Sequence, residues 1–147
     1  MDTEHCTTVM LRFFSILLCL VMWIGLAKVA FGQPFECVVV RGVDGDTIKI
    51  LCPSRDPNVE TVRLIGVDPP ERGESKYKQA SSELVDLAGN YVTIERFGKD
   101  RYGRTLGLVE SQKGCLNVEM RKRYPSTKYD GLLTKKQRNA LKGKGWK

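Results

Sequence analysis

An Asp-Gly dipeptide lies between two β-prone runs. Residues 35–43 and 46–51 are rich in Val and Ile, and Asp44-Gly45 separates them. This arrangement is the strongest short-range signal for a β-hairpin with a two-residue turn, because such turns need residues that tolerate positive φ. We therefore expect two antiparallel strands joined directly by Asp44 and Gly45.

The rest of the chain predicts three further strands and three helices. The third strand ends before Pro69-Pro70, since neither proline can donate a ladder hydrogen bond. Five short strands with a helix after the third predict a β-barrel with helices (α+β), namely a five-stranded Greek-key barrel of the oligonucleotide-binding type (OB-fold) with about three helices. The expected strands are residues 59–67, 91–97 and 105–110, and the expected helices are residues 75–88, 117–123 and 134–141.

Residues 1–32 are predicted to be a signal peptide, followed by one domain over residues 33–147. An apolar run of fourteen residues, 13–26, is shorter than the roughly 20 residues that a membrane-spanning helix needs. Small residues precede Gln33 where a signal peptidase requires them. The expected location is secreted or periplasmic. The alternative is an uncleaved membrane anchor, since acidic residues make the start less basic than usual.

Cys37 and Cys52 face each other if the hairpin has the expected turn. Directly paired residues of an antiparallel ladder have Cα atoms about 4.5 to 5.5 Å apart, within the range of a disulfide. An exported chain would therefore carry a Cys37–Cys52 disulfide. The alternative is two small apolar residues that are merely opposed. Cys115 would be a free thiol, packed rather than reactive.

The predicted domain contains no histidine, because the one histidine of the chain is His5. Mechanisms that need an imidazole base, a Ser-His or Cys-His pair or a His-liganded zinc ion are therefore excluded. Carboxylates and arginines remain. Aspartates offer oxygen ligands for calcium or magnesium, a glutamate can act as a base, and arginines bind phosphate bidentately. This inventory favours metal-assisted phosphodiester chemistry.

Three short runs concentrate these residue types in a fixed order. They are Asp44-Gly45-Asp46-Thr47, Arg63-Leu64-Ile65-Gly66-Val67-Asp68-Pro69-Pro70-Glu71 and Asp100-Arg101-Tyr102-Gly103-Arg104. In this order the runs resemble the staphylococcal nuclease (thermonuclease) family, and the likeness covers residues 35–109. The resemblance implies an OB-fold domain that hydrolyses nucleic acid with calcium.

By this resemblance, Asp46 and Asp68 are the carboxylate ligands of Ca²⁺, and the backbone carbonyl of Pro69 is a third ligand. The family usually has threonine or alanine at the position of Pro69. Proline keeps its carbonyl, and Pro70 favours an extended conformation before it, so the ligand is expected to be retained. Asp44 is either a partner of the metal-bound groups or simply a turn residue.

The resemblance also assigns the groups that act on phosphate. Glu71 matches the general base that activates water. Arg63 and Arg104 match the arginines that meet charge as it develops in the transition state. Arg101 and Tyr102 resemble the loop that contacts the nucleotide, where a tyrosine can stack on a base or bond to a phosphate.

The likeness thins out towards the C-terminus. From Arg121 onward, ten lysines or arginines stand against one aspartate. This segment is either an electrostatic grip on a polyanion or a solvated tail. Arg121 and its two basic neighbours fall where apolar helix positions would be expected, so no substrate contacts are assigned there. Trp146 either packs the last helix onto the barrel or is exposed. Lys99 and Asp100 are expected to be ordinary loop charges.

The sequence therefore predicts a calcium-dependent endonuclease that leaves 3'-phosphates after attack by water activated by Glu71. The expected partners are DNA and RNA, preferably single-stranded or locally melted. No protein partner is implied, a membrane is involved only if the leader is uncleaved, and a monomer is expected. The alternative is a non-catalytic nucleic-acid-binding OB-fold module. Modules that only bind usually lack several of the catalytic side chains, and all of them are present here.

Overall fold

The computed structural model describes residues 37–146, so the predicted signal peptide lies outside the described residues. Within them, no helix is long and apolar enough to cross a membrane. The strands are β1 (Cys37–Gly42), β2 (Thr47–Leu51), β3 (Val59–Leu64), β4 (Tyr91–Lys99), β5 (Thr105–Ser111) and β6 (Gly114–Cys115). The helices are α2 (Tyr77–Ala88), α3 (Leu116–Arg123), the 3₁₀ turn η2 (Asp130–Leu132) and α4 (Lys135–Gly143).

Five of the strands close into a barrel. They follow the order β3-β2-β1-β4-β5 with antiparallel neighbours, and parallel pairing of β3 with β5 closes the ring. The predicted five-stranded OB-type barrel with three helices is therefore confirmed. The short strand β6 extends the sheet beyond β5 and was not expected from the sequence.

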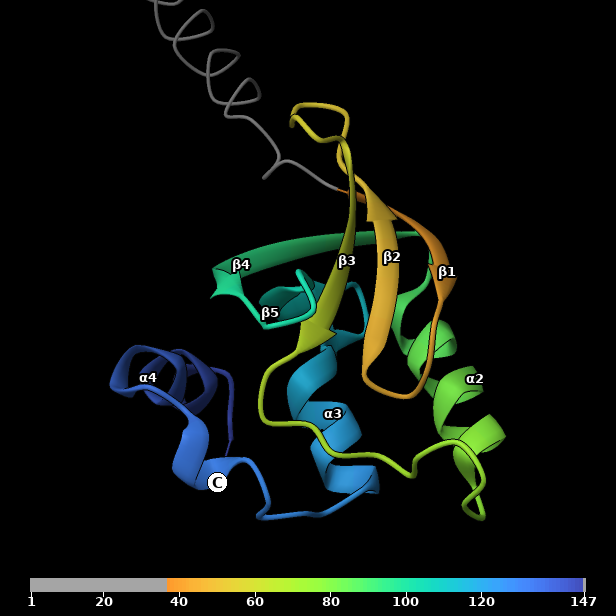
Figure 1. The fold of residues 1–147 in the computed structure, drawn as a ribbon, viewed down its shortest axis with the longest axis vertical. Coiled ribbons are helices and arrows are strands. Elements are labelled where there is room, and N and C mark those ends of the chain that lie inside the picture. The colour runs from red at the N-terminus through yellow and green to blue at the C-terminus, as the bar shows by residue number, and fades with distance from the viewer. Residues whose placement is uncertain (1–36, 147) are drawn as a thin grey trace, which may run out of the picture. The chain divides into compact units, whose positions relative to one another are not determined.

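Helices α2 and α3 lie against the barrel and contribute to its apolar core (Figure 1). Helix α2 buries Ala80, Leu84, Leu87 and Ala88, which recur on one face at helical spacing as the sequence predicted. Helix α3 packs against α2 and β5. The largest fully buried core side chains of the strands are Ile48, Ile50, Val62, Leu64, Val92 and Val109.

The predicted two-residue turn of the first hairpin is wrong. The strands end at Gly42 and resume at Thr47, so four residues connect them, and Val43 N–H donates to the Thr47 carbonyl at 2.8 Å. This longer connection shifts the register by one residue near the turn. A bulge at Val40 shifts it back, so the far ends of the strands pair as the shorter turn would have paired them.

Because the bulge restores the register, Cys37 and Cys52 come together. The structure joins them by a disulfide with their Cα atoms 4.3 Å apart. Among the described residues, Cys115 is a free thiol, and burial raises its pKa. The bridge therefore fastens the open end of the hairpin.

Loss of this disulfide should lower the free energy of unfolding by about 3 kcal/mol, because it closes a loop with a sequence separation of 15 residues in the unfolded chain. The chain has five cysteines. We expect thiol titration of the denatured full chain to find two more thiols after reduction than before it. An equal count before and after reduction would show that the bridge is not formed.

Strand β3 ends at Leu64 and not at residue 67 as predicted. Gly66 turns the chain with φ of 73°, and the Trp146 ring lies so close that a Cβ on Gly66 would stand 2.5 Å from it. Glycine is therefore required both for its backbone conformation and for the contact. The turn leads the following residues, including Asp68, out of the sheet to the rim of the barrel.

The basic C-terminal segment folds back onto the barrel. Thr134 caps α4 through a capping box with Gln137. Leu133, Leu141 and Trp146 form a second core with residues of β5 and of the turn after β3. Trp146 thus packs the last helix onto the barrel, which was one of the two expected alternatives.

Arg121 has a structural role at this contact. Its guanidinium binds Asp130 through two hydrogen bonds of 2.9 and 2.8 Å, donates to the Gly66 carbonyl at 3.3 Å and lies 4.7 Å from the centre of the Trp146 ring. A basic residue at an apparently apolar helix position therefore ties α3 to the C-terminal segment.

Candidate active site

A groove of about 750 Å³ opens at one end of the barrel, where β2 begins and the loop between β4 and β5 turns. It gathers side chains from all three sequence runs and from the C-terminal segment. The residues lining it are Val43, Asp44, Gly45, Asp46, Arg63, Pro69, Pro70, Glu71, Arg72, Tyr77, Asp100, Arg101, Tyr102, Arg104, Tyr129 and Leu132.

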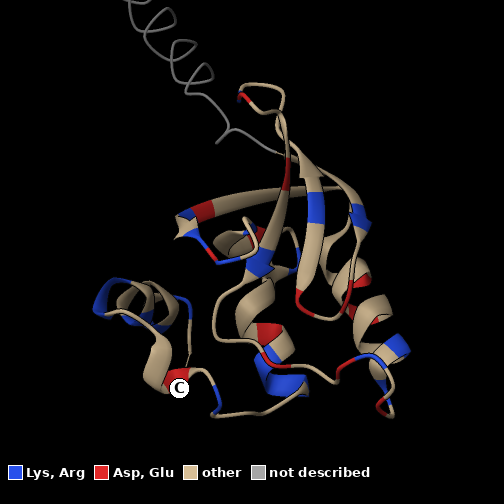
Figure 2. Ribbon diagram, in the orientation of Figure 1, with Lys and Arg blue, Asp and Glu red and all other residues tan. Residues whose placement is uncertain are grey.

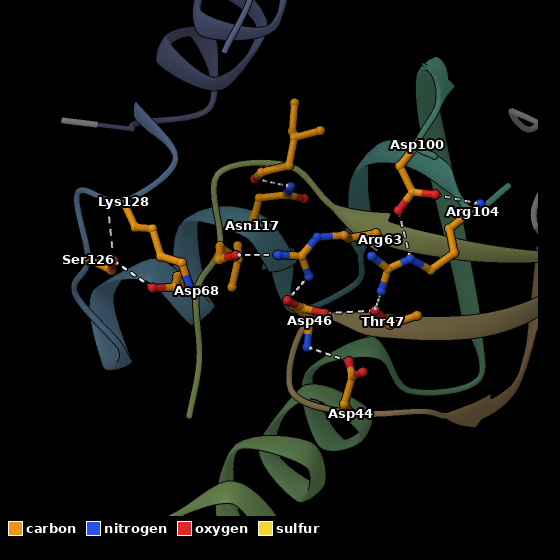
Figure 3. A network of polar contacts seen from close by, with 12 residues as sticks. Asp44, Asp46, Thr47, Arg63, Asp68, Asp100, Arg104, Asn117, Ser126 and Lys128 are labelled. Carbon is orange, nitrogen blue, oxygen red and sulfur yellow. Dashed lines mark hydrogen bonds and ion pairs between the residues drawn. The ribbon is translucent and has the colours of Figure 1, made fainter. Parts of the chain in front are cut away.

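One polar network connects the two predicted catalytic arginines (Figure 3). The carboxylate of Asp46 forms an ion pair with Arg63 and accepts a hydrogen bond of 2.7 Å from the Thr47 hydroxyl. Arg104 Nη1 donates to the same Thr47 oxygen at 3.4 Å. Asp44 accepts from the Asp46 backbone N–H at 3.2 Å, as a turn residue does. The start of β2 therefore positions both guanidinium groups.

Asp100 holds Arg104 in place, so its prediction as an ordinary loop charge was wrong. Its Oδ2 accepts Arg104 Nε at 2.8 Å, and its Oδ1 accepts the backbone N–H groups of Tyr102 and Arg104, both at 2.9 Å. Burial acts to raise the pKa of Asp100, but hydrogen bonds from Arg104 and Tyr102 outweigh it and lower the pKa. The loop between β4 and β5 is therefore built around this carboxylate.

Tyr102 and Arg101 form an exposed lip of the groove. The Tyr102 side chain is 67% exposed. Arg101 donates to its hydroxyl at 2.6 Å, and the guanidinium carbons of Arg101 and Arg104 lie 4.7 and 5.4 Å from the ring centre. An exposed aromatic ring between cations is suited to binding a base and its phosphate.

Glu71 is exposed at the edge of the groove. Its backbone N–H donates to Glu74 Oε2 at 2.7 Å, which fixes the loop. Its carboxylate takes part in none of the ion pairs that the described residues form. The side chain is therefore available to a water molecule or a substrate.

Asp68 does not lie in the groove with Asp46, although the resemblance assigns both to one cation. It lines an adjoining cavity of about 480 Å³. There its Oδ1 is 3.1 Å from Lys128 Nζ, and its Oδ2 accepts from the Ser126 hydroxyl at 2.9 Å. The hydrogen bond to Asp68 raises the pKa of Lys128. Ser126 and Lys128 belong to the C-terminal segment, for which the sequence assigned no contacts, and they hold Asp68 in this adjoining cavity.

The donor chemistry nevertheless fits calcium. The carboxylates of Asp46 and Asp68 and the carbonyl of Pro69 offer only oxygen atoms, which suits a hard cation. Pro69 lines both cavities, as Pro70 and Glu71 do, so the two cavities that hold the aspartates adjoin. Over residues 37–146, no three His, Cys, Asp or Glu side chains gather in a metal-binding group. The ligand set would therefore have to include backbone, water or substrate oxygen.

Tyr129 is a groove residue that the sequence reasoning missed. Its ring centre lies 5.2 Å from the guanidinium carbon of Arg63 and 5.2 Å from Lys128 Nζ. It precedes η2 in a segment whose position depends on the Arg121–Asp130 contact. No periodicity in the sequence marks it, because only tertiary packing brings it to the site.

Asn117 holds the turn after β3, which leads to the site, and the sequence reasoning did not identify it. It is fully buried, and its amide donates to the carbonyls of Ile65 and Gly107 at 2.9 and 3.0 Å and accepts the Val109 N–H at 2.9 Å. These bonds fasten the turn after β3 to β5. A buried amide that forms three hydrogen bonds to backbone groups in this way holds a loop in place.

Comparison with known proteins identifies similar chains. Residues 61–142 match the family model of staphylococcal nuclease homologues. The chain is 36% identical over 110 residues to an uncharacterized endonuclease of Haemophilus influenzae, covering 71% of this chain and 61% of that protein. It is 36% identical over 122 residues to thermonuclease of Staphylococcus intermedius, covering 71% of each.

A third relative, micrococcal nuclease of Shigella flexneri, is 42% identical over 78 residues, which cover 51% of this chain and 42% of that protein. The chain spans 61% of the length of the Haemophilus influenzae relative and 64% of the length of uncharacterized endonucleases of Escherichia coli. Residues 61–142, which match the family model, include most of β3, the segment with Asp68 and Glu71, Arg104, helix α3 and most of α4, but not Asp46.

Proposed function

The chain belongs to the staphylococcal nuclease family, and from this premise we propose that it is a calcium-dependent endonuclease acting on DNA and RNA. The observation that supports the proposal best is the groove in which Arg63, Glu71 and Arg104 lie together. Two guanidinium groups beside a free carboxylate match the needs of phosphodiester hydrolysis, where negative charge grows on the phosphoryl oxygens.

Each side chain has a distinct part in the proposed reaction. Glu71 accepts a proton from water, which attacks phosphorus in line with the leaving 5'-oxygen. Arg63 and Arg104 donate hydrogen bonds to the phosphoryl oxygens and stabilise the charge that develops there. The bond from phosphorus to the 5'-oxygen breaks and this oxygen takes up a proton from solvent, so the products carry a 3'-phosphate and a 5'-hydroxyl.

Asp46, Asp68 and the Pro69 carbonyl would hold calcium, which when bound polarises a phosphoryl oxygen as a Lewis acid. Asp46 also keeps Arg63 in position through their ion pair. The exposed Tyr102 ring favours a strand whose bases are accessible, because a base can stack on it only outside a duplex. We therefore propose single-stranded or locally melted substrates. From the sequence alone, we also propose a monomeric enzyme and export of the chain after removal of residues 1–32.

A non-catalytic nucleic-acid-binding module is the alternative function. The exposed Tyr102 and the basic helix α4 (Figure 2) would serve binding alone equally well. The free carboxylate of Glu71 distinguishes the two functions, since a module that only binds a polyanion gains nothing from a negative charge beside its arginines.

Incubation of the full chain with single-stranded DNA and with RNA, each with calcium or with a chelator, tests the proposal. We expect both substrates to be cut in calcium, and analysis of the fragment ends to show 3'-phosphates. Tight binding without cutting in calcium would instead identify the chain as a binding module.

The basic face of α4 should act on substrate binding and not on the chemical step. We expect neutralising Lys135, Lys136 and Arg138 together to raise KM at low salt and to flatten its salt dependence, with kcat nearly unchanged, because fewer counterions are released on binding. Steady-state kinetics over a range of salt concentrations measures both effects.

A control variant with the same charge change should leave KM unaltered. Arg41, Lys78 and Lys113 are exposed and do not line the groove. If neutralising α4 changed neither KM nor its salt dependence, the helix would be only a solvated face. A collapse of kcat would show that these residues hold the C-terminal segment on the barrel.

A further inference from the structure

A second groove of about 530 Å³ continues from the candidate active site along the outside of β3. The two grooves share Tyr102 and Arg104. The second groove runs between the loop of residues 52–58, which connects β2 to β3, and the loop between β4 and β5. Its volume lies within the range of clefts that bind small molecules, about 300 to 1,000 Å³.

The floor of this groove is a rigid polar cluster. Arg96 Nε donates to Glu60 Oε1 at 3.0 Å, and the Thr105 hydroxyl donates to Glu60 Oε2 at 2.8 Å. Arg96 also lies 3.4 Å from the disulfide sulfur of Cys52. Burial acts to raise the pKa of Glu60, but the bonds from Arg96 and Thr105 outweigh it and lower the pKa. Arg96, which belongs to the same cluster, therefore neutralises the negative charge of Glu60.

The rim of the groove carries two further cations, which do not pair with Glu60. Arg55 lies on the loop between β2 and β3, and Lys99 is the last residue of β4. Both are exposed, and neither forms an ion pair with any described residue. Asp56 is the one acidic rim residue beside them. Tyr102 lies exposed where the two grooves meet. Free cations along a groove and an exposed aromatic ring at its end suit a single strand, because its phosphates can contact the cations while a base stacks on the ring.

We propose that the second groove binds the nucleotides next to the one being cleaved, with Lys99 and Arg55 on their phosphates and Tyr102 under the base at the junction. The partner is a single-stranded polynucleotide, because the groove is continuous with a phosphate-binding site and its free charges are positive. This inference rests on the proposed nucleic-acid function. It deepens that function by assigning residues that select for longer strands.

Binding of fluorescent thymidine oligonucleotides of two and ten nucleotides tests the subsite. The full chain carries Glu71→Gln to slow cleavage and is kept in calcium, and the readout is fluorescence anisotropy taken before any probe is cut. Arg55→Gln with Lys99→Gln is the test variant. Lys78→Gln with Lys113→Gln is the control, because it removes the same charge from exposed positions outside both grooves.

We expect the test variant to bind the ten-nucleotide probe about five-fold or more weakly, and the slope of log affinity against log salt to flatten by about 1.4, since two single-strand phosphate contacts are lost. The advantage of the longer probe over the shorter one should shrink accordingly. The control should keep this advantage. The variant with Arg55→Lys and Lys99→Arg should restore it, because these changes retain the charges.

Equal weakening of both probes would overturn the subsite, because it would show a general effect of charge. Unchanged binding of the longer probe would overturn it as well. The test is separable from the proposed nuclease activity, since it measures binding without turnover. A chain that cuts DNA but shows no advantage for the longer probe would retain its proposed function and lose the subsite.

Discussion

Replacing Glu71 with glutamine is expected to lower kcat about 10²- to 10⁴-fold, the usual contribution of a positioned general base. Glutamine has the same shape but cannot accept the proton from water. The exposed carboxylate of Glu71 forms no ion pair among the described residues, so the thermal midpoint should be unchanged. Rates on a single-stranded oligonucleotide in calcium, with a thermal melt of each variant, measure both quantities.

Glu74→Gln is the matched control for this substitution. It removes one charge from the same loop and keeps an oxygen that can accept the backbone N–H of Glu71. Its kcat should stay near that of the parent chain. If Glu71→Gln lowered kcat only a few-fold, or no more than Glu74→Gln, Glu71 would not be the base.

The arginines should show a comparable loss for a different reason. Arg63→Lys and Arg104→Lys retain the charge but lose the planar fork that binds two phosphoryl oxygens. We expect each to lower kcat about 10²- to 10³-fold, as removal of a transition-state hydrogen-bond donor does. If either variant kept the kcat of the parent chain, that arginine would not stabilise the transition state as proposed. A melt is needed here, because each guanidinium also binds an aspartate.

Removal of calcium should abolish the nuclease activity. The oxygen donors of Asp46, Asp68 and Pro69 suit the flexible coordination of calcium, whereas magnesium demands near-ideal octahedral geometry. We expect no cutting in chelator, full recovery in calcium and poor activity in magnesium.

A binding readout separates a metal site from an indirect effect of calcium. Calcium should raise the thermal midpoint of the chain, because a ligand that binds the folded state stabilises it. This rise should be smaller in the Asp46→Asn variant. Full activity in chelator, or an equal rise in both proteins, would contradict the assignment of Asp46 to the metal.

The fold could be predicted where local chemistry decides it. The Asp-Gly signal located the first hairpin but not the length of its turn, and the apolar stripe located α2. The proline pair indicated that β3 ends before it, although the strand ends earlier, at Leu64. Each of these signals depends on neighbouring residues. The bulge at Val40 could not be predicted, because no residue there marks it and only pairing with β2 fixes the register. Two errors compensated in the hairpin, so Cys37 and Cys52 were correctly paired by a turn that was itself wrong.

The candidate site shows the same division. Arg63, Glu71 and Arg104 belong to short runs at the ends of strands, and the barrel brings those ends together. The link from Asp100 to Arg104 depends on the conformation of the single loop between β4 and β5, and the link from Lys128 to Asp68 depends on how the C-terminal segment folds against the barrel. No spacing in the sequence encodes such contacts, so these two carboxylates were assigned incompletely.

Cleavage of a single-stranded oligonucleotide in oxygen-18 water tests most directly whether water attacks phosphorus in this groove. The full chain is supplied with calcium, and the fragments are analysed by mass spectrometry. We predict one heavy oxygen in a new 3'-phosphate and an unlabelled 5'-hydroxyl on the other fragment. Fragments that carry 5'-phosphates, fragments without label, or an uncut oligonucleotide would contradict the proposed mechanism.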